Sequence, residues 1–176
     1  RRYILDGSMT TAPNDGDPGN GACMRNLPVA LATLNDPETF RQWTLEQCHI
    51  THNHPLSDDA TLALGRMVQR LVLGGGILDC REEARALIAK HPQFRFDRYR
   101  GPCSASIVDT VRTVLHHYFL ADSVRSCIGE TVNGGGDADT AGALAGMLAG
   151  ATYGASTIPQ AWLDRLDKAV VAEIRS

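Results

Sequence analysis

The 176-residue sequence lacks the positive charge excess of a protein whose main role is to bind nucleic acid. Lysine and arginine number 17, against 20 aspartates and glutamates, and the formal net charge at pH 7 is −3. Binding to a phosphate backbone depends on a strong basic excess that neutralises the phosphates. We therefore expect no nucleic-acid partner.

The cysteines form no pattern typical of a disulfide framework or a zinc ribbon. The chain has five, an odd number, far apart in sequence and without a Cys-x-x-Cys pair. Reduced thiols are the better interpretation, and they favour a cytoplasmic location.

Long apolar runs and a signal peptide are also missing. The longest apolar run, 141–151, is too short to span a bilayer, and no apolar run follows the two arginines that open the chain. No methionine precedes "RRYILDG", residues 1–7, which resembles the last turn of a helix. We therefore expect further sequence upstream of Arg1.

No segment shows the clear apolar–polar alternation of a half-buried strand, and even "FRFDRYR", 94–100, is interpreted as a loop. Residues 10–21 form a turn-rich loop, and Gly74 to Gly76 end one helix. Asp36 and Ser57 are the expected N-caps of the first two helices. The remaining helices are expected over 80–91, 104–119, 123–132, 138–153 and 159–175. The sequence predicts a single all-α domain over residues 1–176.

Three glycines, two aspartates and a threonine stand together in "GGGDADT", 134–140. One aspartate at a helix start is explained by capping, but two with a threonine exceed what capping needs. Their carboxylate and hydroxyl oxygens are ligands that suit Mg²⁺ or Mn²⁺. Asp137, Asp139 and Thr140 are therefore candidate metal ligands.

Two other motifs that begin similarly do not fit this segment. A phosphate-binding P-loop needs a lysine after its glycines, and here acids follow. An EF-hand loop starting at Asp137 would need glutamate at its twelfth position, where the chain has Leu148.

Small residues dominate the helix that follows. Gly142, Gly146 and Gly150 are four residues apart and share one helix face, although each costs about 1 kcal/mol of helix propensity relative to alanine. We expect other helices to pack closely on this face and so hold the two aspartates from behind.

Two further segments are open to two interpretations each. "GDPGNGACMR", 16–25, is either a surface turn, which its composition favours, or a backbone cradle for an anion such as diphosphate. "THNHP", 51–55, holds His52 and His54, which are either polar loop residues or, for His52, a substrate contact. No further ligands at zinc-site spacing accompany them.

These three segments, in this order, resemble the ADP-ribosylglycohydrolase family, and the likeness extends to 57–68 and 103–119. The resemblance implies an all-α fold and two bound divalent metals, Mn²⁺ or Mg²⁺. It also implies hydrolysis of the bond between ADP-ribose and a protein side chain. The likeness is strongest to the branch whose substrate is an ADP-ribosylated arginine of dinitrogenase reductase, where hydrolysis restores nitrogenase activity. Members also bind PII-type signal proteins and reach the membrane only through such partners.

The resemblance assigns a role to each motif residue. Asp137, Asp139 and Thr140 resemble metal ligands of the family, and His52 resembles the histidine near the ribose. The loop that binds ADP-ribose would contain Asp17, Gly19, Asn20, Gly21 and Met24.

The chain departs from the family pattern upstream of this loop. Family motifs that supply the other metal ligands and the acid/base carboxylate would precede Arg1. Asp58 and Asp59 are not substitutes, because they follow the histidine motif and suit the first turn of a helix. Ser106 replaces an aromatic residue near the substrate, which leaves recognition of the target residue open. The alternatives are an inactive ADP-ribose-binding or regulatory helical module and a purely structural helical protein.

Overall fold

The computed structural model describes residues 7–13, 15–16, 18–97, 99 and 101–175. In this part of the chain, regular structure is helical apart from two isolated bridges, Gly19–Ser106 and Cys103–Gly136, which confirms the all-α prediction. The α-helices are α2 (Gly21–Met24), α3 (Leu27–Ala32), α4 (Pro37–His49), α5 (Pro55–Val72), α6 (Ile77–Lys90), α7 (Ile107–Leu120), α8 (Val124–Asn133), α9 (Ala138–Tyr153), α10 (Gln160–Leu163) and α11 (Lys168–Arg175). Short 3₁₀ turns, η1 and η2, occupy Pro92–Phe94 and Ala155–Thr157.

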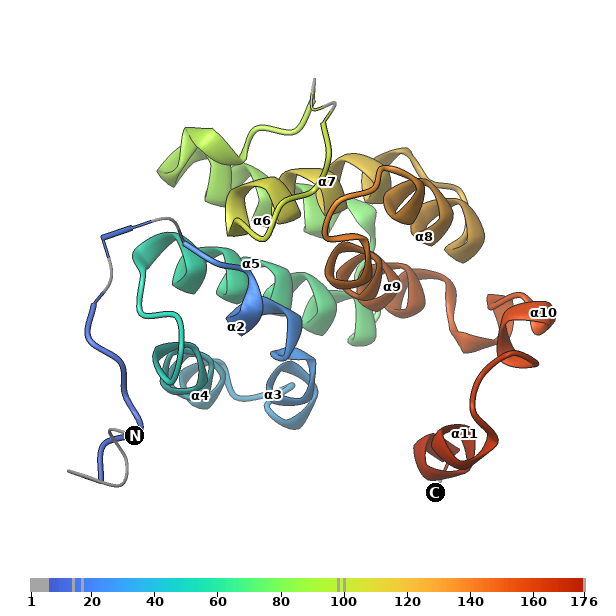
Figure 1. Cartoon of the computed structure of the whole chain (residues 1–176), viewed down its shortest axis with the longest axis horizontal. Coiled ribbons are helices and arrows are strands. Elements are labelled where there is room, and N and C mark those ends of the chain that lie inside the picture. The colour runs from blue at the N-terminus through green and yellow to red at the C-terminus, as the bar shows by residue number, and fades with distance from the viewer. Residues whose placement is uncertain (1–6, 14, 17, 98, 100, 176) are drawn as a thin grey trace.

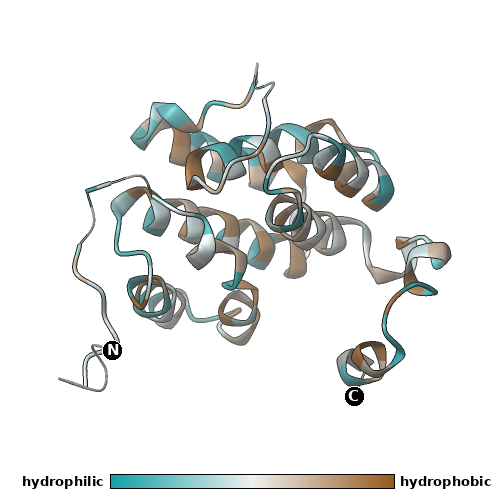
Figure 2. Ribbon diagram, in the orientation of Figure 1, coloured by the Kyte–Doolittle hydropathy of each residue, from teal (hydrophilic) through white to brown (hydrophobic). Residues whose placement is uncertain are grey.

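The helices pack around α5 and α9, which lie in the middle of the molecule (Figure 1). Helices α6, α7 and α8 cover one side of this pair, α3 and α4 lie on the other side of α5, and α10 and α11 stand to the side. Hydrophobic (brown) and hydrophilic (teal) residues alternate along the packed helices in Figure 2, as expected for amphipathic helices that bury one face. Leu64, Met67, Val114 and Leu148 are fully buried in the main core.

Local signals correctly predicted several helix starts, but the expected cap of α5 was wrong. Asp36 caps α4, and its carboxylate accepts the Thr39 N–H at 3.0 Å. Helix α5 begins three residues earlier than expected, because the His54 imidazole accepts the Leu56 N–H at 3.0 Å and Pro55 follows as the first helical residue. Ser57 therefore lies inside the first turn, where it is fully buried.

Two other helix starts differ from the prediction. Helix α6 starts at Ile77 because the Asp79 carboxylate accepts the Gly76 N–H at 2.7 Å. Helix α7 starts at Ile107 because the Ser104 hydroxyl accepts the Ser106 N–H at 3.2 Å and holds this turn outside the helix.

The expected helix over 159–175 is interrupted. Helix α10 ends at Leu163, and a new helix begins at Lys168. The Asp167 carboxylate accepts the Ala169 N–H at 2.8 Å, as an aspartate at a helix N-terminus does. A local cap thus divides a segment whose composition is helical throughout.

The small residues of α9 allow close packing at two of the three glycines. A Cβ at Gly142 would lie 2.7 Å from Cγ2 of Val132, and one at Gly146 would lie 3.3 Å from Cδ1 of Ile128, both on α8. Gly150 has no neighbour within 4 Å of such a Cβ, so close packing does not explain it.

Two expectations fall partly on residues outside the described ranges. The predicted helical turn at residues 1–7 lies outside them except for Gly7. Of 94–100, Phe94 belongs to η1 and the other described residues form no helix or strand, so a loop is the correct description there. None of the helices in the described ranges combines the length and apolar character that crossing a bilayer demands.

Candidate functional site

The turn that precedes α9 determines where the Asp137 side chain leaves the backbone. Gly135 and Gly136 adopt φ angles of +75° and +74°, which residues with a side chain rarely tolerate. A side chain at Gly136 would also overlap the Cys103 carbonyl. That same carbonyl accepts the Asp137 N–H at 2.7 Å, so the turn is held against the segment before α7.

Asp137 occupies the N-cap position of α9, but its carboxylate forms no capping hydrogen bond to the helix. Its Oδ2 instead accepts a hydrogen bond from the Asn20 amide at 2.6 Å. This bond is the main reason why the pKa of Asp137 lies below its usual value, and Thr140 and Asp139 lower the pKa further. The carboxylate is therefore ionised at neutral pH. It hydrogen-bonds to Asn20 and does not cap the N-terminus of α9.

Asn20 is a buried positioning residue, 6% exposed. Its amide nitrogen also donates to the Thr110 hydroxyl at 2.9 Å, so both amide hydrogens are used inside the protein. Its backbone N–H donates to the Ala105 carbonyl at 3.0 Å, which ties the glycine loop to the start of α7. The side chain of Asn20 thus orients Asp137, and its amide hydrogens are not available to a ligand.

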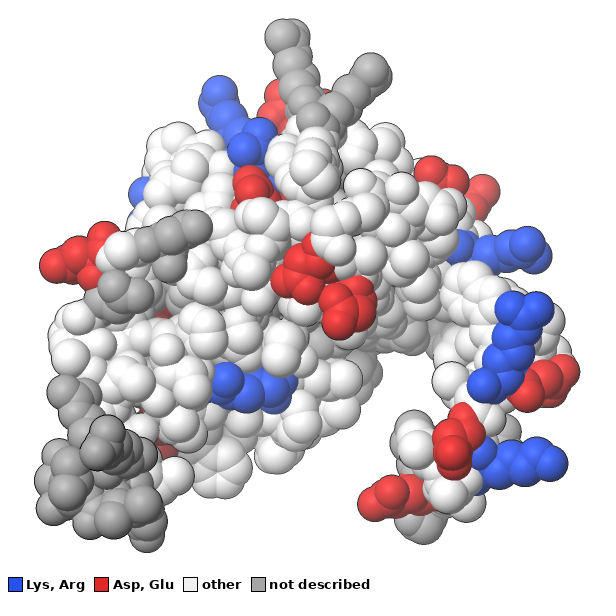
Figure 3. All heavy atoms as spheres, in the orientation of Figure 1, with Lys and Arg blue, Asp and Glu red and all other residues white. Residues whose placement is uncertain are grey.

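The other two candidate metal ligands lie in the first turn of α9. Asp139 is exposed and Thr140 is half-buried, with the Thr140 hydroxyl 3.8 Å from the sulfur of Met24 in α2. Acidic side chains gather in the middle of the face shown in Figure 3, over the beginning of α9. The structure therefore brings Asp137, Asp139 and Thr140 together with Met24.

His52 lies directly against the glycine loop. A Cβ at Gly19 would lie 2.7 Å from the Nε2 atom of His52, and one at Gly21 would lie 2.6 Å from its Cε1 atom. These two glycines are therefore required for the imidazole to approach the loop. The structure thus joins two of the three sequence motifs through this contact.

A chain of hydrogen bonds leads from Arg25 to the His52 ring. An Arg25 guanidinium nitrogen donates to the Thr51 hydroxyl at 2.7 Å, and that hydroxyl lies 2.7 Å from Nδ1 of His52. Because Thr51 accepts from Arg25, its own hydrogen is free to donate to Nδ1, which favours the tautomer that carries its hydrogen on Nε2. Burial and the Arg25 charge both lower the pKa of His52 and so favour the neutral ring.

Sequence reasoning missed three residues that support this site: Arg25, Thr51 and Ser57. The Ser57 hydroxyl donates to the Gly19 carbonyl at 3.0 Å, so the first turn of α5 holds the glycine loop. The sequence around Ser57 matches that of a helix N-cap, and no local signal distinguishes a cap from a residue that holds the glycine loop. Arg25 was visible as part of the Met-Arg pair, but its contacts reach segments more than 20 residues away.

The carboxylates of Asp58 and Asp59 pair with basic side chains of other helices and loops. Asp58 pairs with His49 at 2.9 Å, while Asp59 pairs with Lys90 at 2.7 Å and His91 at 2.6 Å. Both carboxylates are therefore engaged by basic side chains of other segments.

The oxygen donors at the start of α9 are of the kind that a divalent cation binds. Carboxylate and hydroxyl oxygens are the ligands that Mg²⁺ and Mn²⁺ prefer, and the Asp137 carboxylate is not needed to cap its helix. Among the described residues, no three His, Cys, Asp or Glu side chains converge on one point. Asp17, the remaining predicted loop residue, lies outside the described ranges.

A family model for ADP-ribosylglycohydrolases matches residues 2–176. The chain belongs to the ADP-ribosylglycohydrolase family. Over 175 residues it is 58% identical to an ADP-ribosyl-[dinitrogen reductase] glycohydrolase from Rhodospirillum rubrum, an alignment that covers 99% of this chain and 60% of the relative. It is also 28% identical over 160 residues to the ADP-ribosylarginine hydrolase Tri1 of Serratia proteamaculans (strain 568), across 84% of this chain and 42% of that protein.

The fold agrees with this family assignment. A solved ADP-ribosylglycohydrolase-related protein complex contains a chain that superposes with a TM-score of 0.79 at 28% identity, covering 94% of this chain and 60% of the other. The chain thus spans about 60% of the Rhodospirillum rubrum relative's length and 42% of the Serratia proteamaculans relative's.

Proposed function

We propose that this family member takes part in metal-dependent removal of ADP-ribose from a modified arginine of a protein. The observation that carries the proposal is the Asp137 carboxylate, which Asn20 holds away from its helix and beside Asp139 and Thr140. The 58% identity to the Rhodospirillum rubrum relative supports dinitrogenase reductase as the target protein, with reactivation of nitrogenase as the outcome.

In this proposal Asp137, Asp139 and Thr140 hold one side of a Mn²⁺ or Mg²⁺ site. A divalent cation bound there supplies Lewis-acid polarisation and a lowered pKa for water. Asn20 and the Gly136 turn keep Asp137 in place for this task. The carboxylates also stabilise the positive charge that develops on the anomeric carbon when the C–N bond breaks.

The glycine loop would bind the ADP-ribose part of the substrate. The absent side chains of Gly19 and Gly21 let the His52 imidazole lie against the loop, so a diphosphate would meet the loop backbone together with this ring. The Nε2 edge of His52 faces Gly19, where its hydrogen can be donated to an oxygen of the ligand. Met24 lies beside Thr140 and would contact the ligand near the metal ligands. Asp17 completes the proposed loop.

Calorimetry with Mn²⁺ tests the metal site. We expect binding to the wild-type chain, at least tenfold weaker binding to Asp137→Asn because one anionic ligand is lost, and no change in the matched surface variant Asp164→Asn. Equal affinity of the wild type and Asp137→Asn would refute the metal role. Release of ADP-ribose from an arginine-modified protein, measured with the same variants, tests the reaction itself.

One observation favours a second candidate function, an ADP-ribose-binding or regulatory module without hydrolysis. The described residues bring only two carboxylates together at the start of α9, where a dinuclear site needs more. Binding of ADP-ribose without release of ADP-ribose from a modified protein would favour this alternative. In either case we propose a cytoplasmic protein that contacts a PII-type signal protein and reaches the membrane only through such a partner.

A further inference from the structure

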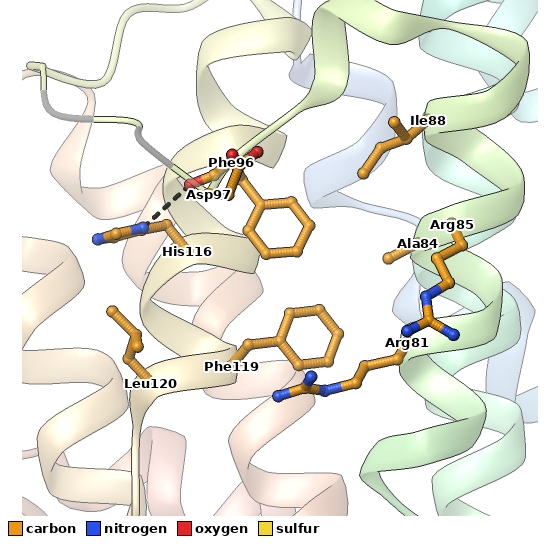
Figure 4. A pocket seen from close by; sticks show the side chains of 9 residues that line it. All are labelled: Arg81, Ala84, Arg85, Ile88, Phe96, Asp97, His116, Phe119 and Leu120. Carbon is orange, nitrogen blue, oxygen red and sulfur yellow. Dashed lines mark hydrogen bonds between the residues drawn. The ribbon is translucent and has the colours of Figure 1, made fainter.

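A hollow lies between α6 and α7, apart from the residues of the glycine loop and the start of α9. Its volume is about 360 Å³, near the lower end for small-molecule pockets. Arg81, Arg85 and Ile88 line it from α6, and Phe119 lines it from α7 (Figure 4). Thr110, which contacts Asn20, lies near the other end of α7.

Two stacked aromatic rings form the apolar part of this pocket. The centroids of Phe96 and Phe119 are 5.4 Å apart, and the two rings are inclined by only 17°. Ala84 contributes a small side chain beside them, and Ile88 extends the apolar surface. A flat ring can lie against such a surface.

Arg81 and Arg85 bring two positive charges to one side of the pocket. The Arg81 guanidinium lies 5.3 Å from the centre of the Phe119 ring. Within the described residues, no carboxylate pairs with Arg81 or Arg85, whereas Glu83 of the same helix is occupied by two arginines of α5. The two guanidinium groups are thus available to an anion.

The other polar groups of the pocket lie away from the arginines. Asp97 is at the opposite end of the hollow (Figure 4). The Nδ1 atom of His116 is 3.1 Å from the Phe96 carbonyl, so this nitrogen is engaged within the protein. The pocket therefore has an apolar centre with its positive charge on the α6 side.

We propose that this pocket binds a small aromatic anion, a ring that packs on Phe96 and Phe119 and carries a phosphate or carboxylate group held by Arg81 and Arg85. An uncharged ring would use only the aromatic surface and would leave both exposed guanidinium groups to water. Inorganic phosphate would leave the aromatic pair exposed. The volume limits the ligand to one or two rings.

Titrations followed by amide NMR and calorimetry test this site with three probes: phenyl phosphate, inorganic phosphate and benzyl alcohol. We expect phenyl phosphate to bind about tenfold more tightly than either fragment, because it makes both kinds of contact. The signals that shift should come from the residues around Ala84 and Phe119.

Variants distinguish the two parts of the pocket. Arg81→Gln with Arg85→Gln should weaken phenyl phosphate binding about tenfold and leave benzyl alcohol unchanged, while Arg165→Gln, at an exposed arginine of the segment after α10, should change neither. Phe119→Leu should reduce the ratio of the affinity for phenyl phosphate to the affinity for inorganic phosphate, because the stacked aromatic surface is lost.

Two results would overturn the proposal. One is equal binding of phenyl phosphate and inorganic phosphate to the wild type. The other is a set of shifts confined to Gly19 and Gly21 that the double arginine variant does not alter, which would place the anion in the glycine loop. Asp137→Asn leaves this pocket intact, so failure of the metal proposal would not affect the result.

Discussion

Replacing Thr51 by valine should remove the preference of His52 for carrying its hydrogen on Nε2. The Thr51 hydroxyl links the Arg25 guanidinium to Nδ1 of His52 through two contacts of 2.7 Å. Valine has the same shape but neither donates nor accepts, so Nδ1 loses its donor. We therefore expect a single tautomer, with the hydrogen on Nε2, in the wild type and a mixture of tautomers in Thr51→Val.

The cost in stability should be small because Thr51 is exposed. One such hydrogen bond contributes about 1 kcal/mol to the free energy of unfolding. With a urea dependence of about 2 kcal/mol per molar, the midpoint should fall by about 0.5 M. Thr51→Ser keeps the hydroxyl and is the matched control.

Long-range ¹⁵N–¹H NMR of the imidazole measures the tautomer directly. The wild type and Thr51→Ser should show one protonated and one unprotonated ring nitrogen, and Thr51→Val should show averaged shifts. If Thr51→Val keeps the Nε2 tautomer, or if Thr51→Ser loses it, the assignment of the hydrogen-bond chain is wrong.

The pKa of His52 adds a dependence on pH to the same site. Burial and the Arg25 charge lower this pKa below the usual value of about 6.5, so the native state binds fewer protons than the unfolded chain. The contribution of His52 to stability is therefore complete well above pH 6.5 and is lost as the pH falls from that value through the lowered pKa of the native state. Urea unfolding of the wild type and His52→Gln between pH 5 and 8 should show a steeper loss in the wild type below about pH 6.5, and parallel curves would contradict this reasoning.

Three further predictions concern the scaffold. Gly136→Ala should lower the free energy of unfolding, measured by urea titration, by about 1–3 kcal/mol, because the φ angle of Gly136 is +74° and a side chain there would overlap the Cys103 carbonyl. The control is Gly129→Ala on α8, where a new side chain meets no neighbouring atom, so this variant should be neutral or stabilising. Ser57→Ala should cost about 1 kcal/mol and broaden the NMR signals of the glycine loop, since the hydroxyl that holds the loop carbonyl is lost, and unchanged loop signals would argue against this role. All five cysteines are buried and free, and burial raises the pKa of the Cys23 thiol to about 12. A thiol reagent at pH 8 should therefore label the native protein far more slowly than the urea-unfolded chain, and mass spectrometry measures both labelling rates.

Local signals predicted helices where the deciding contacts are close in sequence. The start of α4 depends on Asp36 and Thr39, and the start of α8 depends on Ser123 and Ser126, which lie three residues apart in each case. The bounds of α9 agree with the predicted 138–153. Ser57 shows the limit of such reasoning, because its hydroxyl serves a carbonyl 38 residues away and not the start of its own helix.

The sequence by itself determined the all-α class, through helical periodicity and caps, and the identity of the oxygen donors in "GGGDADT". Only the tertiary structure decided which aspartates remain available. Asp58 and Asp59 are engaged by basic side chains of other segments, whereas Asp137 is held by Asn20, 117 residues away in sequence. The physical reason is that a carboxylate's availability depends on which charges and donors the packing of distant helices brings within about 3 Å, and such contacts leave no local pattern in the sequence.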